Sequence, residues 1–148
     1  MKICIIGSGY VGLVSGACFS DLGNTVTCVD INREIIDKLN KGIMPIYEPG
    51  LQELVIRNLK KKRLLFSTDI SSSIRKSDII FICVGTPTKN NKADLKYVIN
   101  VVNTIKSNLN KYKIIVTKST VPVTTGDKIA KILKSNKNKN KFDVVSNP

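Results

Sequence analysis

Histidine is absent from the 148-residue sequence, and aromatic side chains make up only 5% of it. Any proton transfer in which the protein takes part must therefore use groups other than imidazole. No uninterrupted apolar run approaches the roughly 20 residues that a membrane-spanning helix needs. The N-terminus carries one lysine before a short apolar run that already fits a strand, so we see no signal peptide. These absences lead us to expect a cytoplasmic protein with no membrane partner.

Cysteine is present at four positions, but no two of them have the CxxC spacing typical of zinc sites and redox pairs. Cys4, Cys28 and Cys83 fall in predicted core strands, and Cys18 falls on the apolar face of the first predicted helix. We therefore expect buried, reduced thiols that pack as small hydrophobic side chains, and no metal site.

Acidic residues are scarce: 11 Asp and Glu stand against 24 Lys and Arg, which gives a formal net charge of +13. Such a balance can indicate a nucleic-acid-binding protein. Here nearly all of the excess is lysine, as in residues 60–63 and 134–141, and it accompanies abundant asparagine. No aromatic residues are interleaved with the lysines to stack on bases. We therefore expect no nucleic-acid partner, and a positive field that favours an anionic cofactor and substrate.

The first thirty residues hold the most informative pattern. An apolar run over residues 3–6 breaks into Gly-Ser-Gly-Tyr-Val-Gly at 7–12. A helical apolar pattern follows through residue 22, and a β-branched strand over 25–29 ends at Asp30. This is the order and length of a dinucleotide-binding βαβ unit.

Each part of this unit has a physical role. Gly7 permits the tight turn, Gly9 leaves the backbone open to a pyrophosphate, and Gly12 lets the helix pack closely on the strands. The free N–H groups and the dipole of the helix N-terminus favour negative charge. Asp30, 18 residues beyond Gly12, can accept hydrogen bonds from ribose hydroxyls and would repel a 2′-phosphate. The pattern predicts NAD rather than NADP, with FAD as the main rival ligand.

Apolar patterns predict strands and helices in alternation along the rest of the chain. The length, the 42% hydrophobic content and a mean hydropathy of zero fit one domain with one core. Together these features predict an α/β fold, a Rossmann-type doubly wound parallel sheet with strand order 3-2-1-4-5-6. Its ligand edge should gather the turns at 7–12, 85–88 and 118–122. Further strands are expected at 64–67, 78–85, 113–117 and 142–145, and helices at 35–41, 49–59, 70–76, 94–109 and 126–133, with a loop at 89–93 and a polar connector at 135–141.

Several segments in colinear order resemble one family. They are GSGYVGLVSGACFSDLGNTVTCVDIN, KLNKGIMPIYEPGLQEL, FICVGTPT, ADLKYV, KSTVPVTTG and a closing SNP. Along essentially all 148 residues the chain is similar to the N-terminal domain of UDP-glucose 6-dehydrogenases, within the wider UDP-glucose/GDP-mannose dehydrogenase family. The resemblance implies a cofactor-binding part of an enzyme that oxidises UDP-glucose to UDP-glucuronate in two NAD-dependent steps. Full-length members are expected to be homo-oligomers.

The resemblance also implies roles for individual residues. Thr86 matches a residue near the cofactor, although by itself it fits an ordinary strand-to-loop turn. Thr120 matches the threonine that helps to hold the catalytic water beside the nicotinamide, and it is our catalytic candidate. Tyr10 is expected near the cofactor and Glu48 near the same edge, although a packing tyrosine and a loop glutamate explain them equally well. The pyrophosphate turn corresponds to Gly7, Gly9, Val11 and Gly12, and the ribose acid to Asp30.

Two departures from the family pattern matter. Family members often carry a basic residue five positions after the ribose acid, where this chain has Ile35, with Arg33 two positions earlier. The family pattern also continues past Pro148 into a glutamate acid/base, a lysine, an asparagine and a catalytic cysteine. Residues 1–148 are therefore expected to form the NAD-binding domain without the central helix and substrate domain, and to be inactive alone because a nucleophilic thiol is missing.

Three alternatives stay open. A sister enzyme could act on UDP-N-acetylmannosamine or GDP-mannose, because the residues that select the sugar lie mostly beyond the matched segments. A non-catalytic NAD-binding module is a second alternative. A basic nucleic-acid-binding domain is the third, and it predicts salt-sensitive binding that does not need Asp30.

Overall fold

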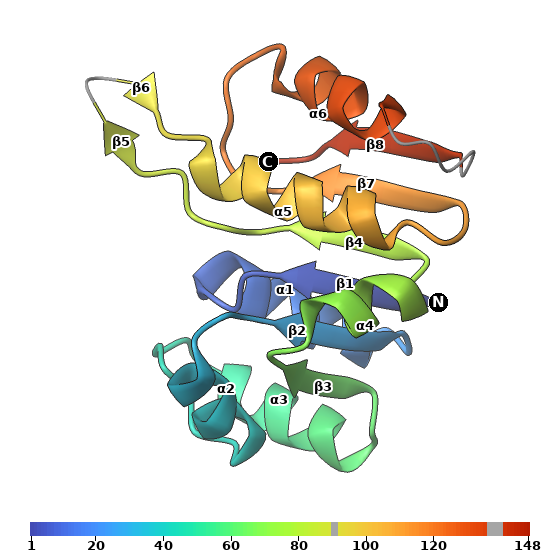
Figure 1. Cartoon of the computed structure of the whole chain (residues 1–148). Helices are drawn as coiled ribbons and strands as arrows, with labels where there is room; N and C mark the ends of the chain where they lie inside the picture. Colours follow the sequence, from blue (N-terminus) through green and yellow to red (C-terminus); the bar gives the residue numbers. More distant parts are fainter. Residues whose placement is uncertain (90–91, 136–140) are drawn as a thin grey trace.

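The computed structural model describes residues 1–89, 92–135 and 141–148. Within these residues, six parallel strands form one sheet in the order β3-β2-β1-β4-β7-β8 (Figure 1). Counted along this sheet alone, the order is the predicted 3-2-1-4-5-6, so the doubly wound fold is confirmed. The strands are β1 (Lys2–Ile6), β2 (Thr25–Val29), β3 (Leu64–Ser67), β4 (Ile79–Ile82), β7 (Lys113–Thr117) and β8 (Phe142–Ser146).

Helices cover both faces of this sheet. Alternate residues of β1 face opposite sides: Ile3 and Ile5 join one apolar cluster, and Cys4 and Ile6 join the other. The first cluster takes its helical residues from α1, α2 and α3, and the second takes them from α4, α5 and α6. Burial on both faces explains why the strands are almost continuously apolar. The helices are α1 (Tyr10–Asp21), α2 (Arg33–Asn40), α3 (Leu51–Lys60), α4 (Ile70–Lys76), α5 (Lys96–Asn108) and α6 (Thr125–Lys134).

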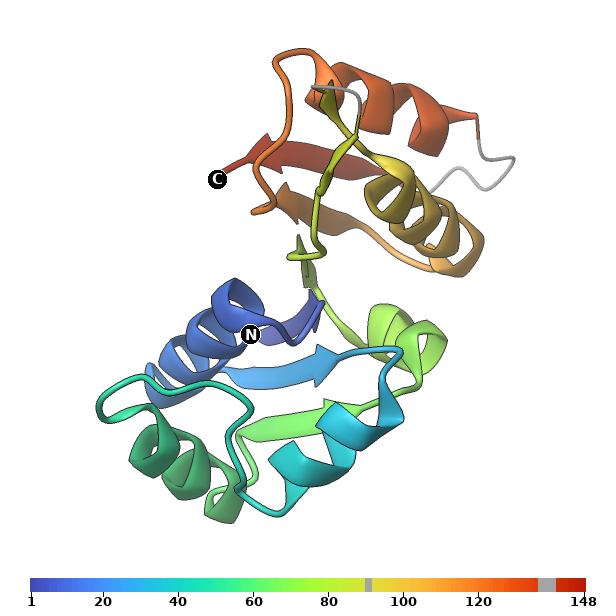
Figure 2. The same cartoon turned by 90° about the vertical axis from the view of Figure 1, so that its left-hand side faces the viewer.

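The crossover from β3 through α4 to β4 divides the molecule into two halves. Figure 2 shows the first half, coloured blue to green, below the second half, coloured yellow to red. The strands β1 and β4 are neighbours and pair in register, with Ile6 opposite Ile82. Their carboxyl ends are therefore the switch point at which ligands of such sheets bind.

Four details differ from the sequence prediction or lie outside it. The predicted loop at 89–93 contains a short antiparallel pair, β5 (Thr88–Lys89) with β6 (Lys92–Ala93), which projects from the sheet (Figure 1). Pro49 is not the first helical residue, because Gly50 has a left-handed φ of 79° and α3 begins after it. The helix predicted from 94 begins at 96. Most of the predicted connector at 135–141 lies outside the described residues.

The cysteines follow the prediction only in part. All four are free thiols, and Cys4 and Cys28 are buried. Burial raises the pKa of Cys4 and of Cys83 to about 12 and raises that of Cys28 further. The prediction for Cys18 was wrong: it is exposed. It follows the buried Ala17 in α1, and a step of about 100° around the helix turns it away from the sheet.

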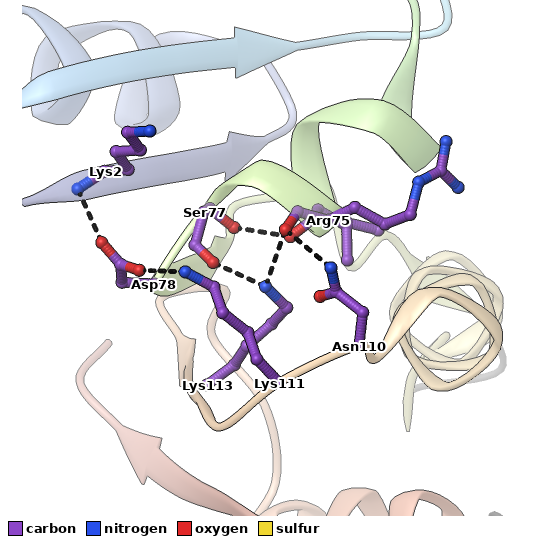
Figure 3. A network of polar contacts seen from close by, with 8 residues as sticks. Lys2, Arg75, Ser77, Asp78, Asn110, Lys111 and Lys113 are labelled. Carbon is purple, nitrogen blue, oxygen red and sulfur yellow. Dashed lines mark hydrogen bonds and ion pairs between the residues drawn. The ribbon is translucent and has the colours of Figure 1, made fainter. Parts of the chain in front are cut away.

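The edge of the sheet at which the strands begin, called here the amino edge, carries a buried lysine (Figure 3). Lys113, the first residue of β7, is 0% exposed. Its Nζ donates a hydrogen bond to the carbonyl oxygen of Ser77 at 2.5 Å and another to that of Arg75 at 3.3 Å. These carbonyls belong to the last turn and the C-cap of α4, where a cation also suits the helix dipole. Burial lowers the pKa of Lys113 to about 8.

Asp78 lies beside this lysine on the amino edge. Its carboxylate accepts a hydrogen bond from the backbone N–H of Lys2 at 3.1 Å and forms an ion pair with Lys111. The hydrogen bond from Lys111, with a further one from Lys2, lowers the pKa of the Asp78 carboxyl. The lysines and the aspartate therefore join the beginnings of β1, β4 and β7 (Figure 3).

No helix among the described residues is long and apolar enough to cross a membrane. In the same residues, no group of three or more His, Cys, Asp and Glu side chains is placed to hold a metal ion.

Candidate functional site

The carboxyl ends of β1, β4 and β7 bring three turns to one edge of the sheet, called here the carboxyl edge. The turn after β1 begins with Gly7, whose N–H donates to the Val29 carbonyl at 2.8 Å. Cys83, which follows β4, donates to the Ile6 carbonyl at 2.8 Å, and Lys118, which follows β7, donates to the Ile82 carbonyl at 2.9 Å. Backbone hydrogen bonds therefore continue across the strands into the turns and hold them side by side.

Two glycines of the first turn are required by the fold. Gly7 has a φ of 105°, and a Cβ atom there would lie 2.6 Å from the carbonyl oxygen of Cys83. A Cβ atom on Gly12 would lie 1.9 Å from the carbonyl oxygen of Gly7. Gly12 therefore lets the helix approach the turn itself, which is a more specific contact than the expected packing on the strands.

Gly9 differs from these two glycines because it faces open space. No atom would lie within 4 Å of a Cβ atom at this position. Gly9 is also the N-cap of α1, whose first turn holds no acidic side chain and has no side-chain cap. The first N–H groups of a helix have no partner within the helix, so Tyr10, Val11 and Gly12 offer donors and a positive dipole end to an anion.

Asp30 is tied directly to the glycine turn. Its Oδ2 accepts a hydrogen bond from the N–H of Ser8 at 2.8 Å, and its Oδ1 accepts one from the N–H of Asn32 at 3.0 Å. Each carboxylate oxygen can accept a second hydrogen bond. The carboxylate is only partly buried. It is therefore held at the end of β2 beside the turn, with acceptor capacity left for ribose hydroxyls.

Thr86 and Thr120 come together although 34 residues separate them. The Thr86 hydroxyl donates to the carbonyl oxygen of Thr120 at 2.9 Å. Between the same turns, the Ser119 hydroxyl donates to the carbonyl of Val84 at 2.6 Å. Thr86 is partly buried, whereas Thr120 is exposed. The turns after β4 and β7 therefore form one unit, with the Thr120 side chain on its surface.

Tyr10 and Glu48 also meet at this edge. The Tyr10 hydroxyl donates to Oε2 of Glu48 at 2.5 Å. This bond, together with the negative charge of Glu48, raises the pKa of the Tyr10 phenol. The sequence placed both residues near the same edge without predicting their bond.

Sequence reasoning missed two residues of this edge and one in the body of α1. Ser8 is buried, and its hydroxyl has no hydrogen-bond partner in the described part of the chain. Ser119 links two turns, as described above. A Cβ atom on Gly16 would lie 2.4 Å from Sγ of Cys28. Only Gly16 carried a usable signal, because it follows Gly12 by four residues and lies on the same helix face.

Ile35, where the resemblance led us to expect a basic residue, serves packing. Ile35 is partly buried and contacts the core cluster that includes Ile36 and Phe66. Arg33 is exposed at the first position of α2, three residues after Asp30. Asn32 caps this helix by accepting a hydrogen bond from the N–H of Ile35 at 3.2 Å.

Comparison with known proteins agrees with this geometry. Residues 1–148 match the model of the UDP-glucose/GDP-mannose dehydrogenase family, NAD binding domain. UDP-glucose 6-dehydrogenase TuaD of Bacillus subtilis is 55% identical over 149 aligned positions, which cover 99% of this chain and 32% of that protein. A UDP-glucose 6-dehydrogenase of Rhizobium meliloti is 47% identical, with 100% of this chain and 34% of that protein covered. The chain thus spans about a third of the length of these relatives.

Solved structures show the same similarity. A ternary complex of GDP-mannose dehydrogenase from Pseudomonas aeruginosa superposes with a TM-score of 0.94 at 36% identity, covering 100% of this chain and 36% of that one. A UDP-glucose dehydrogenase from Pyrobaculum islandicum gives a TM-score of 0.91 at 35% identity, covering 99% and 35%. The family model and these superpositions span the glycine turn, the acid after β2 and the paired threonine turns, and the chain belongs to the UDP-glucose/GDP-mannose dehydrogenase family as its NAD-binding domain.

Proposed function

We propose that the chain is the cofactor-binding part of an NAD-dependent UDP-glucose 6-dehydrogenase, which oxidises UDP-glucose to UDP-glucuronate with two NAD. The observation that carries the proposal is the pairing of an open Gly9 with a carboxylate tied to the same turn through Ser8. That pairing suits a dinucleotide, because one turn can then bind its pyrophosphate at Gly9 and its ribose at the adjacent carboxylate. The curated relatives at 55% and 47% identity support UDP-glucose as the substrate.

In this proposal the cofactor lies across the carboxyl edge. Its pyrophosphate accepts hydrogen bonds from the helix N-terminus, and its adenosine ribose donates to Asp30. Bound NAD supplies the hydride acceptor. Thr86 and Thr120 lie at the nicotinamide end, where Thr120 holds the catalytic water. The pyrophosphate contacts are assigned to Gly7, Gly9, Tyr10, Val11 and Gly12.

The oxidation also needs a nucleophilic thiol, and the thiols of the described residues do not provide one at this edge. Burial raises the pKa of Cys4, Cys28 and Cys83, which disfavours the reactive thiolate. Cys18 is exposed on α1, away from the sheet. Because the chain spans a third of its relatives, we assign the thiol, the acid/base groups and the homo-oligomer contacts to the complete protein. Four free thiols fit a reducing compartment, so we place the protein in the cytoplasm.

Calorimetric titration of this chain with NAD, NADP and FAD tests the cofactor assignment. We expect saturable binding of NAD, weaker binding of NADP because of Asp30, and no binding of FAD. Binding of FAD in preference to NAD, or no NAD binding by a folded chain, contradicts the proposal. The structural similarity to GDP-mannose dehydrogenase keeps a sister substrate as the alternative. Assays of the complete protein with UDP-glucose and with GDP-mannose distinguish the two substrates.

A further inference from the structure

Tyr10 is the first residue of α1 and follows the open N-cap Gly9. Its side chain is 53% exposed and belongs to neither apolar cluster. Packing in the core therefore does little to fix the ring. Among the described residues, the 2.5 Å hydrogen bond to Glu48 orients it.

Glu48 belongs to the segment that joins α2 to α3, residues 41–50. Its backbone carbonyl accepts a hydrogen bond from the N–H of Leu51 at 3.1 Å, so the residue is fixed to the first turn of α3. At the other end of the segment, the Gly42 carbonyl accepts one from Nε2 of Gln52 at 3.3 Å. Glu48 also lines a hollow of about 190 Å³ on this segment. A carboxylate on an anchored backbone can hold an exposed ring in one position.

Charge makes this placement informative. A carboxylate near a helix N-terminus interacts favourably with the helix dipole and can take the place of an anionic ligand there. The Tyr10 phenol donates a hydrogen bond to Glu48, so this carboxylate has a partner other than the helix N-terminus. The bond and the nearby negative charge raise the pKa of the phenol, which keeps the ring neutral.

We propose that Glu48 is a positioning residue for the cofactor: it holds the Tyr10 ring beside the glycine turn, where the ring forms a side wall of the pyrophosphate site. This inference rests on the proposed function, because it assigns Glu48 to the same NAD site. Glu48 does not contact the cofactor and acts through Tyr10.

Calorimetric NAD titrations of a small set of variants test the inference. A ring that has lost its bond must be ordered again when NAD binds, which predicts about threefold to tenfold weaker NAD binding in Glu48→Ala and in Tyr10→Phe. The double variant should bind no more weakly than either single variant, because both changes break one contact. Glu48→Gln should stay within about twofold of the wild type, since an amide oxygen still accepts the bond.

Glu53→Gln is the matched control. Glu53 is exposed in the first turn of α3. Its replacement removes one negative charge from the same region and leaves the Tyr10–Glu48 hydrogen bond intact. Its NAD affinity should equal that of the wild type. Two-dimensional NMR spectra of each variant verify the fold, and the Tyr10 titration should move towards the ordinary tyrosine pKa in Glu48→Ala.

The outcomes separate the inference from the proposed function. If the wild type binds NAD and Glu48→Ala and Tyr10→Phe bind it equally well, Glu48 has no positioning role and the NAD site stands. Tighter binding by both Glu48→Ala and Glu48→Gln also overturns the inference, because it shows that Glu48 only repels the cofactor. If the folded wild type does not bind NAD, the proposed function fails and the role of Glu48 fails with it.

Discussion

The two edges of the sheet use polar groups in opposite ways. At the amino edge, Lys113 is fully buried and its ammonium group is bonded to two backbone carbonyls. At the carboxyl edge, Gly9 faces open space, Thr120 is exposed, and Asp30 keeps acceptor capacity beyond its two backbone bonds. Polar groups at one edge complete the fold, and those at the other remain available to a ligand. Because all strands of the sheet run in one direction, the residues that stabilise the fold lie at one edge and those available for binding lie at the other.

Within the glycine turn, too, one position is required by the fold and another is open to a ligand. Gly12 is required by close contact with the Gly7 carbonyl, whereas Gly9 has no neighbour that requires it. The absence of a side chain therefore serves the fold at Gly12 and leaves room for a ligand at Gly9. Substitutions at the two positions should separate these roles.

The largest effect is expected from this pair of substitutions. Gly12→Val places a Cβ atom 1.9 Å from a backbone oxygen, so it should destabilise the fold by about 4 kcal/mol or more. In Gly9→Val the Cβ atom has no neighbour within 4 Å, and the φ of −71° is one that any residue adopts. This variant should fold normally and lose NAD binding. Urea unfolding and calorimetry measure the two effects, and normal NAD affinity in Gly9→Val would refute the turn assignment.

The buried Lys113 of the amino edge should make the free energy of unfolding depend on pH. Burial lowers the pKa of Lys113 to about 8 in the folded state, whereas its ordinary value is 10.5. Between these values the unfolded chain binds the extra proton, so the lysine's contribution to stability rises with pH. Relative to Lys113→Met, the wild type should gain about 2 kcal/mol of unfolding free energy between pH 7 and pH 10.

Urea unfolding of the wild type and of Lys113→Met at pH 7 and at pH 10 measures this gain. The groups that face Lys113 are Lys111, Asp78 and Cys4, and they titrate in both chains, so their effects largely cancel in the difference. NAD affinity should be unchanged in Lys113→Met. A constant difference between the chains across this range would show that Lys113 is not desolvated in the folded protein.

A smaller effect is expected at the ribose acid. Asp30→Ala should weaken NAD binding about tenfold, the loss of a hydrogen bond to a charged group, and should reduce discrimination against NADP. Asp37→Ala removes an equal charge from the exposed side of α2 and serves as the control. Calorimetry with both cofactors gives the result, and unchanged affinities for both in Asp30→Ala contradict the assignment of this acid.

The smallest effect is expected at the paired turns. Thr86→Val removes the hydroxyl that donates to the Thr120 carbonyl. The bond is close to solvent, so its loss should lower the unfolding free energy by no more than about 1 kcal/mol and weaken NAD binding two- to threefold. Thr25→Val, at the beginning of β2, is the matched control. A tenfold loss of NAD affinity would instead indicate that the Thr86 hydroxyl itself contacts the cofactor.

Local patterns were sufficient to predict the fold and the glycine turn. The apolar runs, the turn glycines and Asp30 follow one another within thirty residues, and the order of elements constrains the sheet. The sequence could not predict contacts between distant residues, such as the Tyr10–Glu48 bond across 38 residues or the bond from Lys113 to Ser77 across 36. Such contacts depend on how loops and helix ends meet after the sheet has formed.

The wrong prediction for Cys18 has a simple physical cause. Cys18 was assigned to the apolar face of α1, but the helix presents Leu13 and Ala17 to the sheet and turns Cys18 outward. A rotation of the helix by one residue position decides whether Cys18 faces the sheet or the solvent, and the spacing of apolar residues does not determine that rotation. No local signal in the sequence indicated the burial of Lys113, because this burial depends on carbonyls of the last turn and the C-cap of α4.

An NMR titration of the ¹⁵N-labelled chain with NAD tests most directly whether the carboxyl edge alone is the binding edge. We expect the largest amide shifts in the glycine turn, at Asp30 and in the paired turns, at Gly9, Tyr10, Gly12, Thr86 and Thr120. The amides of Ser77, Asp78 and Lys113 at the amino edge should not move. Shifts centred on the amino edge, or saturable binding without shifts in the glycine turn, would contradict this division of the molecule.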